Sequence, residues 1–215
     1  MPQKYARAAG VLFVISMIAG FFGEMYAPSK INAQFQEPLF RWGFAAYLVE
    51  ALCDIILTWI FYVLLRPVHR QLSLLAAFFG IVSTSTFASA QLFYFASQLL
   101  FRDAAYLAAF TTDQRHALAL LAMKTCTLGG GVFMVFYGAG MTIRGTLIFH
   151  STYLPKLLGV LLALAGLGFF TRAFLLVLAP RYASGLLLAP MALAGLALAL
   201  WLLTKGVDET RWPDA

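Results

Sequence analysis

The stretch FAAYLVEALCDIILTWIFYVLL, residues 44–65, places two acidic side chains inside an apolar segment that is long enough to cross a bilayer. A spanning helix needs about 20 predominantly apolar residues. Glu50 and Asp54 are four residues apart, so on a helix they lie on the same face. Each charge at the centre of a spanning helix costs about 2.5–3.5 kcal/mol on insertion scales. The stretch therefore predicts a transmembrane helix that carries a polar site.

The composition of the whole chain is that of an integral membrane protein. Of its 215 residues, 62% are hydrophobic and 11% are charged, whereas soluble domains contain about 25% charged residues. The net charge is +6, but the basic residues are spread over the ends of the apolar runs. This distribution excludes a nucleic-acid-binding patch and suits membrane topology, so the expected partner is the lipid bilayer.

Six apolar windows predict an all-α fold, a single transmembrane domain over residues 1–215 that forms a bundle of six spanning helices. The windows cover residues 8–26, 39–65, 72–101, 115–143, 155–178 and 183–204. The segment 103–110 is too short to span, and it predicts a small interfacial helix with Tyr106 and Phe110 against the membrane. Thr111, followed three residues later by Gln114, predicts a capped helix start.

The distribution of Lys and Arg predicts the orientation of the chain in the membrane. One predicted side holds Lys4, Arg7, Arg66, Arg70, Arg144, Lys156, Lys205 and Arg211. The other side holds Lys30, Arg41, Arg102, Arg115 and Arg181. The excess on the first side, together with the even number of spans, predicts that both termini are cytoplasmic.

The cysteine and histidine positions predict that the protein has no cofactor and no metal. Cys53 and Cys126 lie inside apolar segments and have no metal-ligand spacing. The three histidines, His69, His116 and His150, lie near segment ends, which excludes a haem held by two histidines in the bundle core.

Polar residues at membrane depth are the candidate site residues, because intramembrane ionisable groups are functional candidates by default. Tyr47, Glu50, Asp54 and Thr58 form one stripe on the second helix, and the other helices add Ser83, Gln91, Lys124 and Arg172. Depth along the helices predicts that Lys124 approaches Glu50 and that Arg172 reaches the outer interface. If the cluster is structural, Asp54 is expected to bond hydroxyl groups of the third helix.

Small residues on the last two helices predict close helix contacts or an outward interface. Gly159, Ala163 and Gly166 fall on one face of the fifth helix, and Gly195 and Ala199 repeat this pattern on the sixth.

Three stretches resemble domain-of-unknown-function family 4386, a family of integral membrane proteins. They are ARAAGVLFVISMIAGFFGE (6–24), EALCDIILTWIFYVLLRPVHRQLSLLAAFFG (50–80) and GTLIFHSTYLPKLLGVLLALAGLGFF (145–170). The resemblance implies six spanning helices, a bacterial inner membrane and an acidic residue at the position of Asp54. It also implies that Lys124 and Arg172 are particular to this chain, and it implies no activity.

Three classes of function remain open. The first is a protein that binds or moves a small molecule, ion or proton at the polar cluster; its ligand would be small and amphiphilic or ionic. The second is an accessory or scaffolding protein with a structural cluster, which forms homo-oligomers or binds a membrane-protein partner. The third is an intramembrane enzyme that uses Lys124 or a serine such as Ser83, although no histidine lies at membrane depth to activate it. No catalytic residue is assigned, and the first class is preferred.

Overall fold

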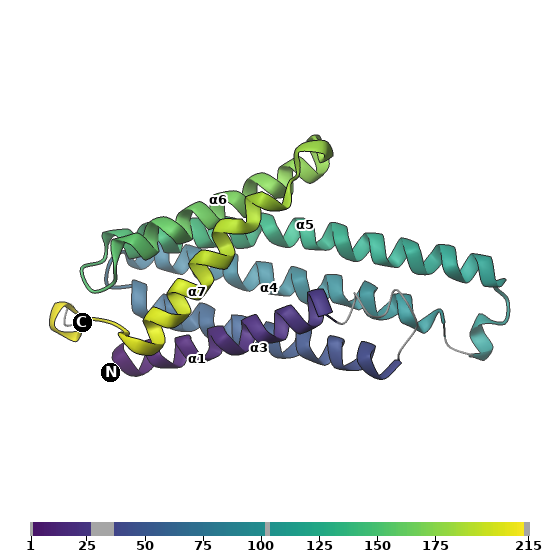
Figure 1. Cartoon of the computed structure of the whole chain (residues 1–215), viewed down its shortest axis with the longest axis horizontal. Helices are drawn as coiled ribbons and strands as arrows, with labels where there is room; N and C mark the ends of the chain where they lie inside the picture. Colours follow the sequence, from purple (N-terminus) through teal and green to yellow (C-terminus); the bar gives the residue numbers. More distant parts are fainter. Residues whose placement is uncertain (1, 27–36, 102–103, 213–215) are drawn as a thin grey trace.

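The computed structural model describes residues 2–26, 37–101 and 104–212, which form helices and turns and contain no strand (Figure 1). The long helices are α1 (Pro2–Gly20), α3 (Glu37–Leu65), α4 (Arg70–Leu99), α5 (Thr112–His150), α6 (Lys156–Leu178) and α7 (Ala189–Thr204). Six helical segments of the described chain are long and apolar enough to cross a membrane. The prediction of an all-α bundle with six spanning helices is confirmed.

The six long helices form a closed cycle of neighbours. Each one packs against the next along the chain, and α7 packs back against α1. Both chain ends lie at the same end of the bundle, as an even number of spans requires (Figure 1). The middle of the bundle therefore receives side chains from every helix.

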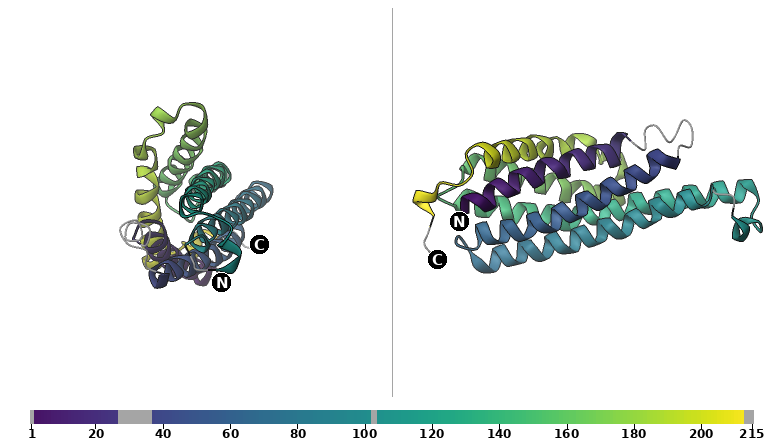
Figure 2. Two further views of the ribbon diagram at one scale, coloured as in Figure 1. Left: turned by 90° about the vertical axis from the view of Figure 1, so that its right-hand side faces the viewer. Right: turned by 90° about the horizontal axis from the view of Figure 1, so that it is seen from below.

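At the end opposite to the termini the bundle opens. The hairpin of α6 and α7 diverges from α5, and the hairpin of α4 and α5 projects beyond the other helices (Figures 1 and 2). At a rise of about 1.5 Å per residue, the 39 residues of α5 measure about 58 Å. The hydrocarbon core of a bilayer is about 30 Å thick, so α5 extends well beyond it.

Several boundaries differ from the sequence windows. Helix α5 begins three residues before the window 115–143 and ends seven residues after it. The first helix begins at Pro2 and continues after Gly20 as a π-helix, η1 (Phe21–Tyr26). The last span begins with a 3₁₀ turn, η4 (Gly185–Leu188), which leads into α7.

The described part of the connection between α4 and α5, residues 104–110, contains no interfacial helix of the predicted length. Within the described part of 103–110 the chain forms one 3₁₀ turn, η2 (Ala105–Leu107), while Arg102 and Asp103 lie outside the described residues. The predicted cap of α5 is confirmed, because the Thr111 hydroxyl accepts from the Gln114 backbone N–H and the Gln114 side chain accepts from the Thr111 N–H.

Helices α5 and α6 approach each other closely through glycine. A Cβ at Gly145 would collide with the α6 backbone at Gly159 and Ala163, and one at Gly166 would collide with Gly138 and Thr142. The small-residue face predicted on α6 is therefore a contact with α5. Gly195 of α7 likewise faces α1, so these glycines do not form an outward interface.

The end of the bundle that holds the termini is fastened by hydrogen bonds between distant parts of the chain. The Gln3 side chain donates to the Lys205 carbonyl (2.9 Å) and accepts from the Val207 N–H (2.9 Å). The Tyr153 hydroxyl donates to the Leu64 carbonyl at 2.5 Å. Burial of this phenol between the helix ends raises the pKa of Tyr153.

Candidate functional site

Asp54 lies in the middle of α3 and faces α1. The Ser16 hydroxyl of α1 donates a hydrogen bond to Asp54 Oδ1 at 3.2 Å. Asp54 was predicted to bond hydroxyl groups of the third helix, α4; the hydroxyl that reaches it belongs to α1 instead. Serine packs well between helices because it is small, and its hydroxyl satisfies one acceptor of the carboxyl group.

Arg144 of α5 is a basic residue that interacts electrostatically with this carboxyl group. It is 9% exposed, and its Nη2 donates to Thr58 Oγ1 (3.1 Å) and to the Ala76 carbonyl (3.5 Å). The guanidinium also lies 5.8 Å from the centroid of the Phe61 ring, a cation–π distance. Arg144 thus connects α5 to α3 and α4.

The placement of Arg144 corrects the orientation argument from sequence. Arg144 was counted among the basic residues at a membrane surface, but its side chain turns inward and is buried. It therefore contributes to the interior of the bundle and carries no information about topology.

Gly80 of α4 makes room for the guanidinium. A Cβ at this position would collide with Arg144 Nη2 and with the Thr58 side chain. Glycine is required at such a close approach because every other residue carries a Cβ.

A small cavity lies where the six helices meet. Each long helix contributes to its lining, and one residue from each is Phe13, Asp54, Gly80, Arg144, Leu162 and Leu198. The space available to water is about 20 Å³, which holds one water molecule. Thr58, Thr84 and Tyr137 add hydroxyl groups to the lining, so polar and apolar side chains both border the cavity.

Asp54 and Arg144 share this cavity without touching. They interact electrostatically, yet among the described residues no hydrogen bond or ion pair joins them directly. The arrangement can accept a proton or a single water molecule between two opposite charges.

Glu50 and Tyr47 lie one and two turns from Asp54 along α3 and outside this cavity. Glu50 packs against α1, where a Cβ on Gly20 would lie 2.8 Å from Glu50 Oε1. Tyr47 is buried, and its ring lies 5.7 Å from that of Phe87 and 5.8 Å from that of Tyr94. Of the predicted stripe, Asp54 and Thr58 enter the central site.

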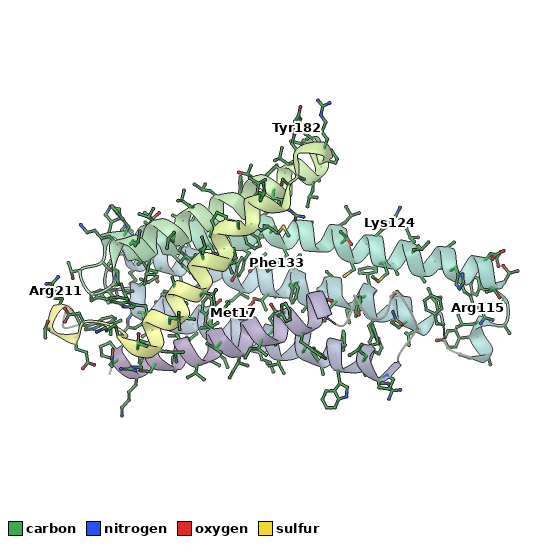
Figure 3. All side chains as sticks on the ribbon, viewed as in Figure 1. Met17, Arg115, Lys124, Phe133, Tyr182 and Arg211 are labelled. Carbon is green, nitrogen blue, oxygen red and sulfur yellow. The ribbon has the colours of Figure 1, made fainter. Side chains whose placement is uncertain are left out.

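The structure does not bring Lys124 to Glu50. Lys124 is exposed on α5, and its side chain points away from the other helices (Figure 3). The predicted pairing fails because Lys124 points away from the other helices, whereas Glu50 packs against α1. Arg172 of α6 donates to Met134 Sδ of α5 at 3.3 Å, so it packs between helices at some distance from the central cavity.

Ser83 and Gln91 are both buried on α4. The Ser83 hydroxyl donates to the Gly80 carbonyl at 2.8 Å, a hydrogen bond within α4. In the described residues no cluster of His, Cys, Asp and Glu has the grouping of a metal site. The geometry therefore assigns neither residue a catalytic role.

The sequence analysis missed Arg144, Thr84, Tyr137, Ser16 and Gly80 as parts of the site. Arg144 was missed because an arginine near the end of a helix ordinarily extends to the interface. One signal was available: five residues, most of them apolar, separate it from His150 at the end of α5. This distance is more than one helical turn inside the apolar run.

A closed bundle of six apolar helices around a buried cavity defines the class of this molecule, an integral membrane protein of six spans. Within this class, the chain belongs to the family described as Domain of unknown function (DUF4386), whose model matches residues 8–206. No curated protein and no solved structure matches the chain. The family resemblance seen in the sequence is confirmed, and the activity has to be argued from geometry.

Proposed function

We propose that this protein takes up and releases a proton at Asp54 inside the membrane, with Arg144 as the fixed opposite charge. One observation carries the proposal: the two groups line the same water-sized cavity at the meeting point of six helices and do not bond to each other. A carboxyl group separated from its counter-charge by such a gap can change protonation without any movement of the helices.

The size of the cavity favours a proton over a larger ligand. Small-molecule sites have volumes of about 300–1,000 Å³, whereas water can occupy about 20 Å³ here. A proton, carried by water, needs no more space than this. Charged residues inside a bilayer are costly and frequently form proton relays.

The location that we propose is a bacterial inner membrane with both termini in the cytoplasm. Basic side chains surround the end of the bundle that holds the termini, and among them are Lys4, Arg7, Arg66, Arg70, Lys156 and Lys205, all exposed. Such an excess of Lys and Arg is typical of the cytoplasmic side.

Infrared difference spectroscopy of the protein in lipid tests the proposal. A pH jump in the wild type should change the carbonyl band of a protonated carboxyl group, and Asp54→Asn should abolish that change. Asp113→Asn is the matched control, because Asp113 is an exposed carboxylate in the first turn of α5 and its removal should leave the band intact. Identical spectra for the wild type and Asp54→Asn would overturn the proposal.

A structural clamp is the second candidate function of the same cluster. It is favoured by the hydrogen bonds from Arg144 to Thr58 and to the Ala76 carbonyl, which connect three helices. The two functions differ in what they require of stability. Only the clamp requires that the charged pair Asp54 and Arg144 stabilise the folded protein more than a neutral pair of similar volume.

A further inference from the structure

Beyond the central cavity, α4 carries three buried oxygen atoms that have no hydrogen-bond partner among the described residues. They are Gln91 Oε1, Tyr94 Oη and Gln98 Oε1. The side chains are 7%, 4% and 7% exposed, respectively. Spacings of three and four residues place all three on one face of the helix.

Buried polar groups without partners are expensive. Each one costs about 1–3 kcal/mol when it is left unsatisfied, and three on one helix face would remove a large part of the stability of a small protein. Buried waters ordinarily satisfy such groups, provided that there is room and several polar partners. Their alignment on one face would allow ordered water to satisfy all three together.

Room for water exists beside the deepest of the three groups. A hollow of about 250 Å³ between α3 and α4 is bordered by Gln91, Tyr47 and Ser89. Its rim includes Leu48 and Leu92, both exposed on the outside of the bundle. The buried Gln91 and Tyr47 side chains lie on the inner side of the hollow, and the exposed Ser89, Leu48 and Leu92 lie on its outer side.

The same face of α4 leads to the central cavity. Thr84 lines that cavity, and it lies seven residues, or about 10 Å, from Gln91 along the helix axis. Phe87 fills the interval: it is 6% exposed, and its ring lies 5.7 Å from Tyr47 and 5.3 Å from Phe133. An aromatic layer thus separates the unsatisfied oxygens from the Asp54 site.

We infer that the face formed by Gln91, Tyr94 and Gln98 is a hydrated entrance from the side of the membrane opposite to the termini, closed at its inner end by the ring of Phe87. Water in this entrance donates hydrogen bonds to the three oxygens. The delivery of protons through this entrance to Asp54 rests on the function proposed above. The hydration of the entrance rests on the buried oxygens alone.

A ladder of single cysteines on α4 tests the entrance. The background is Cys53→Ala together with Cys126→Ala, and the probe is a cationic, membrane-impermeant methanethiosulfonate added from either side of proteoliposomes.

The test positions are Gln91→Cys and Gln98→Cys. The matched controls are Phe93→Cys and Val82→Cys, whose side chains are 46% and 43% exposed on the outside of the bundle and do not line the hollow. Each variant must elute as a single species in size-exclusion chromatography.

Because the reactive species is the thiolate, which requires water, the test positions should react at least about tenfold faster than the controls. The faster reaction should occur only from the side opposite to the termini. Equal rates at Gln91→Cys and Phe93→Cys would overturn the entrance, and so would faster reaction at Phe93→Cys.

The closing role of Phe87 has its own measurement. Thr84→Cys should be protected while Phe87 is present and should become reactive when Phe87→Ala is added. Reaction of Thr84→Cys behind an intact Phe87, or continued protection after its removal, would overturn the closure. The ladder is repeated in Asp54→Asn, where the reaction rates should be unchanged. A failed ladder with normal infrared spectra would therefore reject the entrance alone, and the converse result would reject the proton site alone.

Discussion

The carboxyl group of Asp54 on α3 and the guanidinium of Arg144 on α5 line one cavity, yet no direct hydrogen bond or ion pair joins them in the described chain. Each group instead bonds a hydroxyl of another helix: Asp54 accepts from Ser16 of α1, and Arg144 donates to Thr58 of α3. The opposite charges are thus held by their surroundings at a separation that leaves space for water.

Removing one charge of this pair should destabilise the protein far more than removing both. Arg144→Met should lower the free energy of unfolding by about 3–5 kcal/mol, because it leaves the other buried charge uncompensated. The double variant Asp54→Asn/Arg144→Met should regain most of that loss. Denaturant titration in mixed micelles measures both. A double variant that is as unstable as the single one would indicate the structural clamp.

Neutralising Lys124 should have little effect. The side chain is exposed and points away from the other helices, so Lys124→Gln should change the free energy of unfolding by no more than about 0.5 kcal/mol. The same titration measures this. A loss as large as that of Arg144→Met would restore Lys124 to the polar site.

Two glycines of α5 should respond to alanine in opposite directions. At Gly145 a Cβ would collide with the α6 backbone at Gly159 and Ala163, and overpacking of this kind costs about 1–3 kcal/mol or more. At Gly130 a Cβ would meet no described atom within 4 Å, and the better helix propensity of alanine should add about 0.5–1 kcal/mol.

Thermal unfolding of Gly145→Ala and Gly130→Ala in the same detergent measures the difference between the two positions. If both variants melt at the wild-type temperature, α5 and α6 do not pack through glycine. If both melt earlier, the open surface at Gly130 is covered in the native membrane protein.

The Tyr153 hydroxyl should stabilise the end of the bundle that holds the termini in a pH-dependent way. Tyr153→Phe removes the hydrogen bond to the Leu64 carbonyl and should cost about 0.5–1.5 kcal/mol at neutral pH. Burial raises the pKa of Tyr153 in the folded protein, so the unfolded chain ionises first, at about pH 10. The contribution is complete below that pH and is lost as the pH rises above it.

Unfolding curves of the wild type and Tyr153→Phe, recorded from neutral to alkaline pH, check this sign. The difference in stability should be constant at neutral pH and should shrink at alkaline pH, where the wild type alone loses the Tyr153 contribution. A difference that grows with pH would contradict the assignment.

The sequence predicted the helices far better than their partners. The apolar windows and the cap at Thr111 depend on local patterns, and the structure has six spans and that cap. The pairing of Lys124 with Glu50 assumed that helix ends mark the membrane surface, which fails for a helix as long as α5. The inward turn of Arg144 depends on Gly80, a residue 64 positions earlier, and no local pattern connects the two.

The hydrogen bonds between Gln3 and the residues after α7 have a consequence for biosynthesis. Helix α1 is made before the other five spans described here, and its partner carbonyl at Lys205 is made after all of them. Until α7 is in place the cavity lacks the wall that Leu198 provides. A chain truncated before α7 would therefore leave the lining around Asp54 and Arg144 incomplete.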